Sequence, residues 1–154
     1  MKRITRNWMF LLAFILGITG VSYCAQMDIA DLVDKFQKAT DLQKDQILAD
    51  NLGKEITAGG VVINAGEYDF FDTVNDIKGT YYHVGTEQQK TKNNTLYQLI
   101  FLFKDKDKAK DIYKGHLIQK DGSLIRITDE RLQIAVWIFC GELTDSDKAL
   151  FKQD

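Results

Sequence analysis

The pattern of apolar and polar residues predicts a domain built mainly from strands. The run Leu96–Phe103 is almost entirely apolar and ends in a charged block, which is typical of a strand buried on both faces. Earlier strands are predicted at 54–64, 68–74 and 80–84. The first two are separated by a predicted turn at Ala65-Gly66.

The first predicted strand carries two adjacent glycines, Gly59-Gly60, at its centre. Glycines inside a strand mark a sharp bend or a bulge. We therefore expect the strand at 54–64 to turn a corner of a barrel and to serve both halves of it.

The end of the domain reads as strands joined by short turns. His116–Lys120 and Leu124–Thr128 flank Asp121-Gly122, a sequence that favours a two-residue hairpin turn. The last strand, 131–140, has apolar residues on both faces, with Ile134, Val136 and Ile138 on one of them.

Helical patterns precede the strands. Residues 28–52 predict two short helices, the first with an apolar stripe that ends at Phe36. Thr40 and Gln43 form the capping-box pattern at the start of the second, which Leu42 and Ile47 are expected to anchor.

Two further helices are predicted later in the chain. The charged segment 104–113 has acidic residues near its start and lysines near its end, and Gly115 is a natural stop. Another helix is expected near Asp145–Lys152, capped by Thr144 or Asp145. The polar segment 86–94 has no periodicity and predicts a mobile loop.

Together these elements predict an α+β fold that is mainly β. We expect a five- to six-stranded oligonucleotide/oligosaccharide-binding (OB) type barrel with a helix between a late-middle strand and the final hairpin. The predicted division is N-terminal helices at 26–53, barrel at 54–140 and C-terminal helix at 141–154.

Two segments carry a family resemblance. Residues 35–62 run through Asp50–Thr57 into a Gly-Val-Val strand, and Lys110–Ile118 places a glycine before a strand near the end of the domain. Both are similar to the secreted bacterial OB-fold proteins called tRNA anticodon-binding-like, over about residues 30–140. The resemblance implies kinship of fold, and it brings neither tRNA binding nor any functional residue with it.

The N-terminus has the layout of an export signal. Basic residues precede the uncharged apolar stretch Trp8–Val21, and smaller residues follow it. We predict a signal peptide over 1–25, cleaved near 22–25, which engages the export machinery and delivers a periplasmic or secreted protein. An uncleaved membrane anchor is the alternative.

Cys24 has further interpretations. It lies where the lipid-bearing cysteine of a bacterial lipoprotein stands, although Tyr23 replaces the usual small residue before it. If it survives cleavage in an oxidising compartment, it is also able to form a disulfide with Cys140. Otherwise Cys140 is expected to be a lone buried thiol at a strand end.

Charge lowers the expectation of nucleic-acid binding. Removing a leader that holds three of the 20 basic residues and none of the 22 acidic ones gives a net charge of −5. A basic face is still conceivable at Lys106, Lys110 and Lys114, which repeat every four residues of the predicted helix. The alternative is a solvated face neutralised by the neighbouring aspartates.

The sequence lacks recognisable catalytic and metal-binding motifs. Neither His83 nor His116 belongs to a Cys-x-x-Cys or His-Glu-x-x-His pattern, and the serines lie outside nucleophile motifs. We therefore predict no enzyme activity, no metal and no cofactor.

The best binding candidates are rings on the second and third predicted strands, the face with which OB barrels bind extended ligands. The candidates are Tyr68, Phe70, Tyr81, Tyr82 and His83. Because neighbours in a strand point to opposite faces, some of these rings are expected to fill the core instead. An oligosaccharide, a nucleic acid or an envelope protein is the expected partner. The alternative function is a cell-envelope scaffold, with a lipid on Cys24.

Overall fold

The computed structural model describes residues 27–72 and 77–151, and it is an α+β domain. The described strands are β1 (Glu55–Asp72), β2 (Ile77–Thr86), β3 (Gln89–Lys90), β4 (Leu96–Phe103), β5 (Leu117–Glu130) and β6 (Gln133–Phe139). The described helices are α1 (Ile29–Lys38), α2 (Asp41–Asn51), α3 (Lys106–Ala109) and α4 (Asp145–Phe151). The predicted leader, including Cys24, lies outside the described residues.

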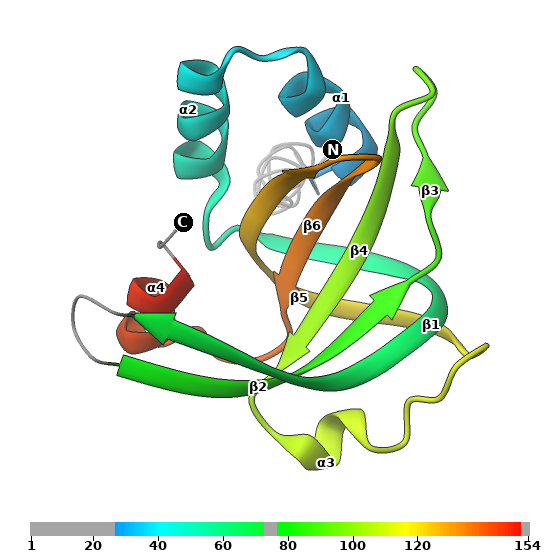
Figure 1. Cartoon of the computed structure of the whole chain (residues 1–154), viewed down its shortest axis with the longest axis vertical. Helices are drawn as coiled ribbons and strands as arrows, with labels where there is room; N and C mark the ends of the chain where they lie inside the picture. The colour runs from blue at the N-terminus through cyan, green and yellow to red at the C-terminus, as the bar shows by residue number, and fades with distance from the viewer. Residues whose placement is uncertain (1–26, 73–76, 152–154) are drawn as a thin grey trace, which may run out of the picture.

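Five of the strands form a near-closed ring. Around it, β1 pairs with β2, β2 with β4, β4 with β6, β6 with β5, and β5 again with β1. The β4–β6 pairing is parallel and the others are antiparallel, while the short β3 adds to the edge of β4. Figure 1 shows the resulting curved sheet, with helices around it.

β1 is the strand shared by both halves, as the glycine pair predicted. Its first part, Glu55–Val61, pairs with β5, and the rest pairs with β2, with a register shift between Val62 and Asn64. A side chain at Gly59 would place a Cβ 2.5 Å from the Ile118 carbonyl oxygen, so the close approach of the two strands requires glycine there.

The turn predicted at Ala65-Gly66 is wrong, because β1 continues through these residues to Asp72. The separate strand predicted at 68–74 is therefore the second half of β1 as far as Asp72, and residues 73–74 lie outside the described residues. β2 is the next strand, and Tyr68 of β1 lies opposite Tyr81 of β2.

The hairpin predicted at Asp121-Gly122 is also wrong, because β5 runs straight through these residues. Gly122 lies opposite Ile56 in the β1–β5 ladder, and a Cβ on it would come within 2.6 Å of the Phe139 carbonyl oxygen. Glycine is needed here for close strand packing, and the chain reverses at residues 131–132 instead.

The helix predicted over 104–113 is much shorter in the structure. α3 has a single turn, capped by Asp105, whose side chain accepts a hydrogen bond from the Asp107 backbone nitrogen. Ala109 is buried and Ile112 packs partly against the core. The many charged residues of this segment leave too little apolar surface to hold a longer helix against the barrel.

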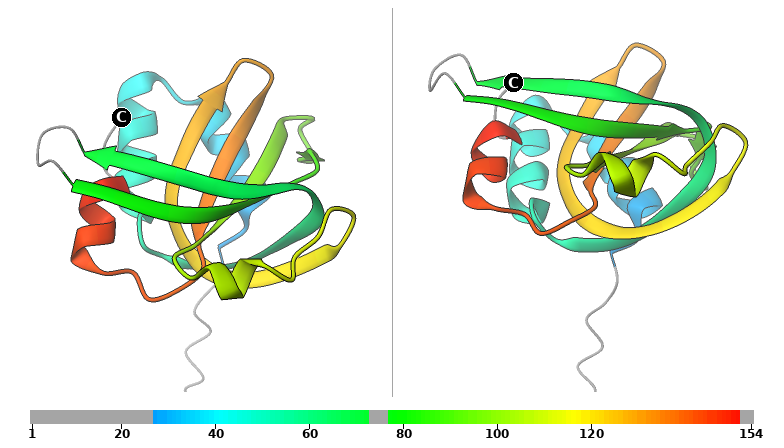
Figure 2. Two further views of the ribbon diagram at one scale, coloured as in Figure 1. Left: turned by 60° about the horizontal axis from the view of Figure 1, so that its bottom comes forward. Right: turned by 90° about the horizontal axis from the view of Figure 1, so that it is seen from below.

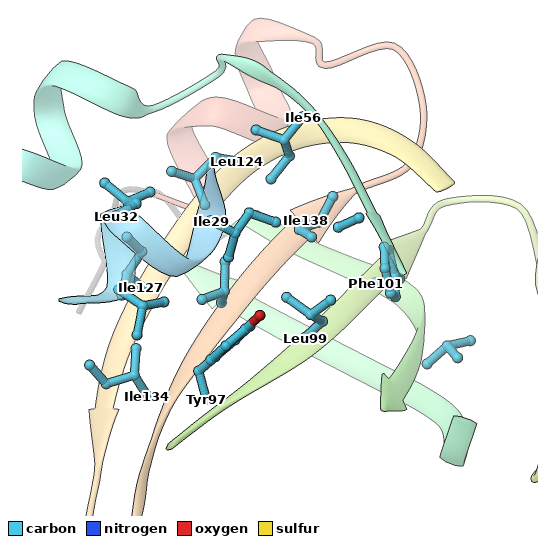
Figure 3. Close-up of a cluster of buried hydrophobic side chains, with 14 of the residues drawn as sticks. Ile29, Leu32, Ile56, Tyr97, Leu99, Phe101, Leu124, Ile127, Ile134 and Ile138 are labelled. Atoms are coloured by element: carbon cyan, nitrogen blue, oxygen red, sulfur yellow. The ribbon is translucent and has the colours of Figure 1, made fainter. Parts of the chain in front are cut away.

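α1 supplies most of the helical cover for the barrel core. Its predicted apolar stripe is buried and consists of Ile29, Leu32, Val33 and Phe36. Figure 3 shows Ile29 and Leu32 among the core side chains of the strands. Figure 2, seen from below, places α3 in front of the ring and α1 behind it. The two ends of the ring are thus covered by different helices.

α2 packs more loosely. The predicted capping box between Thr40 and Gln43 is confirmed. The prediction that Leu42 anchors the helix is wrong, because its side chain is 81% exposed. Ile47 packs partly against the core, and none of the helix residues is fully buried.

The predicted loop 86–94 contains β3 and is tied to α1. The buried Asp34 carboxylate accepts hydrogen bonds from Thr91 Oγ1 (2.6 Å), Asn93 Nδ2 (2.6 Å) and Thr95 Oγ1 (2.9 Å). The Thr91 hydrogen bond, with those of Thr95 and Asn93, keeps the pKa of Asp34 below its ordinary value despite burial. One carboxylate thus fixes the whole turn.

α4 covers part of the outer face of the ring, as Figure 1 shows beside the β1–β2 arm. The predicted C-terminal helix is therefore confirmed as far as Phe151. A second apolar cluster forms beneath it, made of Tyr81, Leu102, Ile125, Phe139, Leu150 and Phe151.

Candidate functional site

Among the described side chains, three neighbouring rings lie on the part of the outer face that α4 leaves uncovered, and they are here called the ring cluster: Tyr68, His83 and Trp137. The Tyr68 ring meets Trp137 edge-on, with 5.3 Å between centroids, and meets His83 at 6.2 Å. Tyr68 is 39% exposed, and the other two are partly buried. Rings in this arrangement offer a mixed edge-and-face surface to a flat ligand.

Strand alternation explains why these rings share a face. In β2 the side chains of Tyr82 and Val84 pack toward the barrel core, so His83 points to the other side. The ring of His83 lies against β1, where a Cβ on Gly66 would be 3.0 Å from His83 Cε1. Glycine at residue 66 therefore makes room for the imidazole.

The His83 imidazole is held by packing more than by polar contacts. Its Nδ1 is buried and has no hydrogen-bond partner among the described residues. An unpaired buried nitrogen is costly, because desolvation is not repaid by a hydrogen bond. His83 is consequently the member of the ring cluster that carries a buried nitrogen without a hydrogen-bond partner among the described residues.

Side-chain amides and a hydroxyl share the outer face with the ring cluster, since Gln98 and Gln133 both lie next to core-facing residues in their strands. Gln133 Nε2 donates to Gln98 Oε1 (2.8 Å), and Gln98 Nε2 donates to the Thr86 carbonyl oxygen (2.8 Å). Trp137 Nε1 donates to Thr128 Oγ1 (3.3 Å), which fixes the indole on the sheet. These bonds leave donor and acceptor capacity on the amides for a ligand.

Trp137 was not among the residues predicted for this face. The signal was nevertheless present in the sequence, since Trp137 alternates with Val136 and Ile138, which face the core. What the sequence did not indicate is that Tyr68 of β1 reaches Trp137 of β6, because that contact depends on how the sheet curves.

Tyr81, a predicted binding residue, is buried in the structure. It is 2% exposed, packs against Phe139 and Phe151, and donates from its hydroxyl to Asp147 Oδ1 (2.6 Å). Its ring is therefore unavailable at the surface. Burial, followed by the contact with Asp147, raises the pKa of Tyr81.

Asp147 is the buried acceptor of this network. Burial by itself raises its pKa, but hydrogen bonds from Thr144, Tyr81 and Lys104 outweigh burial and leave the pKa below its ordinary value. Thr144 and Asp147 also cap α4 reciprocally, with Asp147 N donating to Thr144 Oγ1 (3.2 Å) and Thr144 N to Asp147 Oδ2 (3.1 Å). The group is a structural tie between α4 and the ring.

The remaining predicted rings have other roles. Tyr82 packs partly against the core, and the Lys106 ammonium lies 5.8 Å from its ring centre. The Phe70 side chain lies outside the described residues. Of the five predicted binding residues, the structure thus brings together Tyr68 and His83 at an accessible face.

The predicted basic face does not form. Lys106 lies 3.8 Å from Glu67, and Lys110 pairs with Asp107 at 3.0 Å. Because α3 ends at Ala109, Lys114 lies beyond the helix and cannot share a helical face with the other two. Two of the three lysines are thus paired with neighbouring carboxylates, and the third lies off the helix.

Comparison of the chain with protein-family models, curated proteins and solved structures gives no match. The resemblance to tRNA anticodon-binding-like proteins therefore stays a prediction.

Of the two cysteines, Cys140 lies among the described residues. Cys140 is a free, partly buried thiol, and burial raises its pKa to about 12. Cys24 lies outside the described residues, so lipidation and a disulfide both stay predictions.

Within residues 27–72 and 77–151, groups of three or more His, Cys, Asp or Glu side chains suited to a metal ion do not occur. His116, the second histidine, is exposed and meets the Tyr113 ring edge-on at 5.4 Å. Of the helices in the described part of the chain, none has the length and hydropathy to span a membrane.

Proposed function

We propose that the domain is an OB-type barrel that binds an extended oligosaccharide across the ring cluster. The OB assignment is supported by the order of the ring strands, by the parallel β4–β6 pairing and by the short helix between β4 and β5. The observation that carries the binding proposal is the contact of Tyr68 with both His83 and Trp137 on a face that α4 leaves uncovered.

The chemistry of the face favours a sugar over a nucleic acid. Binding along a phosphate backbone requires several cations that are free to replace counterions, whereas Lys106 and Lys110 have carboxylate partners. Arg126, which lies opposite Trp137 and is unpaired among the described residues, is a single charge. Side-chain amides such as Gln98 and Gln133 suit hydroxyl groups, which both donate and accept hydrogen bonds. Aromatic rings supply flat apolar surface for the faces of sugar rings.

Export is part of this proposal and is supported by the predicted leader. A protein delivered to the periplasm or the exterior meets envelope and extracellular glycans. The scaffold role and the lipid anchor on Cys24 stay predictions, and no described contact favours them.

The test is a binding screen of the purified protein against oligosaccharides and single-stranded oligonucleotides, followed by variants. Tyr68→Ala is expected to weaken the binding of a glycan hit by about tenfold, since removing a half-exposed ring that a sugar face covers costs about 1–2 kcal/mol of buried apolar surface. Tyr113→Ala is the matched control, because Tyr113 is also exposed but lies away from the ring cluster.

The proposal fails if no oligosaccharide binds, or if Tyr68→Ala and Tyr113→Ala have equal effects on a glycan that does bind. Selective, salt-dependent binding of oligonucleotides would also overturn it, since it would identify phosphate as the recognised group.

A further inference from the structure

A groove next to the ring cluster runs between α2, α4 and one edge of β5. It has a volume of about 330 Å³, at the lower end of the range of small-molecule sites. In Figure 1 the helices α2 and α4 lie on the same side of the molecule, next to β5. This groove is here called the α2–β5 groove.

The groove exists because β5 changes partners along its length. From Leu117 to Ser123 it pairs with β1, and from Ser123 to Glu130 with β6. Beyond Leu124, the edge that faced β1 therefore has no strand beside it in the described part of the chain. α2 and α4 border that edge without filling it.

Specific contacts join β5 to α2 and the segment after it near both ends of the α2–β5 groove. At one end, the Gly53 backbone nitrogen donates to the Leu124 carbonyl oxygen (2.7 Å). At the other end, Lys44 Nζ pairs with Asp129 Oδ2 at 2.8 Å. The bounded length favours a small molecule over an extended peptide, which needs an open strand edge.

The lining combines an apolar body with few charges. The apolar contributors are Phe36, Leu48, Ala49, Leu52, Ile125, Ile127 and Phe151. Leu48 and Leu52 are only partly buried, since α2 packs loosely on the ring. The groove therefore leaves aliphatic surface that a ligand would cover with a gain in free energy.

The charged groups that line the groove are Lys44, Asp45 and Arg126. Lys44 is already paired with Asp129, whereas the side chain of Arg126 has no hydrogen bond or ion pair with the described residues. A guanidinium is the side chain best shaped to hold a carboxylate or phosphate through two parallel hydrogen bonds. The lining is thus complementary to a small anion with an apolar tail.

We infer that the α2–β5 groove binds a small amphipathic carboxylate, with its head group on Arg126 and its aliphatic tail against Leu48 and Leu52. None of the three rings lines the groove, but the two sites adjoin: Thr128 lines the groove and accepts a hydrogen bond from Trp137, and Arg126 lies opposite Trp137 in the β5–β6 ladder.

The experiment titrates the full chain with octanoate by calorimetry, with octanol as the neutral probe. Octanoate is expected to bind at one saturable site, and Arg126→Gln is expected to weaken it by about tenfold or more, the value of a charge-assisted hydrogen bond. Arg131→Gln is the matched control, because Arg131 is exposed at the β5–β6 turn. Leu48→Asp, which places a negative charge on the apolar wall, is expected to abolish binding.

Circular dichroism of each variant checks that it is folded. The inference is supported if Arg126→Gln and Leu48→Asp both lose octanoate while Arg131→Gln does not, and if Arg126→Gln leaves octanol binding unchanged. It is overturned if octanoate shows no saturable binding, if the two arginine variants behave alike, or if folded Leu48→Asp still binds octanoate with full affinity.

Discussion

The hydrogen bond between Tyr81 and Asp147 allows the stability of a variant to be predicted quantitatively. Tyr81→Phe keeps the ring packing against Phe139 and Phe151 and removes only the hydroxyl that donates to the carboxylate (2.6 Å). A hydrogen bond to a charged group contributes about 1.5–3 kcal/mol. Because Asp147 keeps its bonds from Lys104 and Thr144, we expect a loss near the lower end, about 2 kcal/mol.

Urea denaturation followed by circular dichroism measures this loss. With a slope of about 1–3 kcal/mol/M for a domain of this size, the midpoint is expected to fall by about 1 M with no change of slope. In an Asp147→Asn background the same bond is neutral, so the Tyr81→Phe penalty is expected to fall to about 1 kcal/mol.

The pH dependence has a definite sign. The pKa of Asp147 is lower in the native state than in the unfolded chain, so the stabilisation by its ionised form is complete above the unfolded pKa of about 3.9. It is lost as the pH falls through the lower native pKa. The Tyr81→Phe penalty is therefore expected to be constant from about pH 5 to 8 and to shrink in stronger acid.

Two results would refute this reasoning. A penalty below about 0.5 kcal/mol would mean that the hydroxyl bond adds nothing to folding. Equal penalties in the wild-type and Asp147→Asn backgrounds would mean that the charge on Asp147 has no part in it.

Three further predictions concern the core, the free thiol and the loop tied to α1. Phe101→Ala is expected to lower the free energy of unfolding by about 3–5 kcal/mol, since Phe101 is completely buried, and a loss below 1.5 kcal/mol would contradict its central position. Cys140 is expected to react far more slowly with a thiol reagent at pH 8 in the native protein than in urea, because burial keeps it protonated; equal rates would contradict this. Asp34→Ala is expected to speed hydrogen exchange in residues 91–95, whereas Asp31→Ala, which loses only an exposed pair with Lys92, is not; equal exchange in both variants would disprove the anchoring role.

Local patterns predicted much of the fold. The stripe on α1 and the capping box at Thr40 depend on neighbours in sequence, and both are confirmed. The sharing of β1 by both halves of the ring is confirmed as well, although the irregularity in its pairing lies between Val62 and Asn64, after the Gly59-Gly60 pair. The wrong turns share one cause. Ala65-Gly66 and Asp121-Gly122 have the composition of turns. In the structure, however, each glycine makes room for atoms of another segment of the chain, which the sequence around the glycine does not reveal.

The candidate site was harder to predict for a similar reason. Alternation tells which residues share a face, but α4 decides which part of that face is covered, and so removes Tyr81 and leaves Tyr68. The α2–β5 groove depends on the distance between a loosely packed helix and a strand edge. The apolar pattern of a single segment predicts neither the position of α4 on the outer face nor the distance between α2 and β5.

The double pairing of β1 has a consequence for unfolding. Half of this strand is bonded to β5 and half to β2, segments separated by some thirty residues of chain. Because the same strand is hydrogen-bonded to β5 and to β2, separating it from one partner strains its pairing with the other. The barrel is therefore expected to unfold in a single cooperative step. The amides of β1 should then be among the last to exchange with solvent, and the long-range contacts that close the ring should make refolding slow compared with that of a helical protein of similar length.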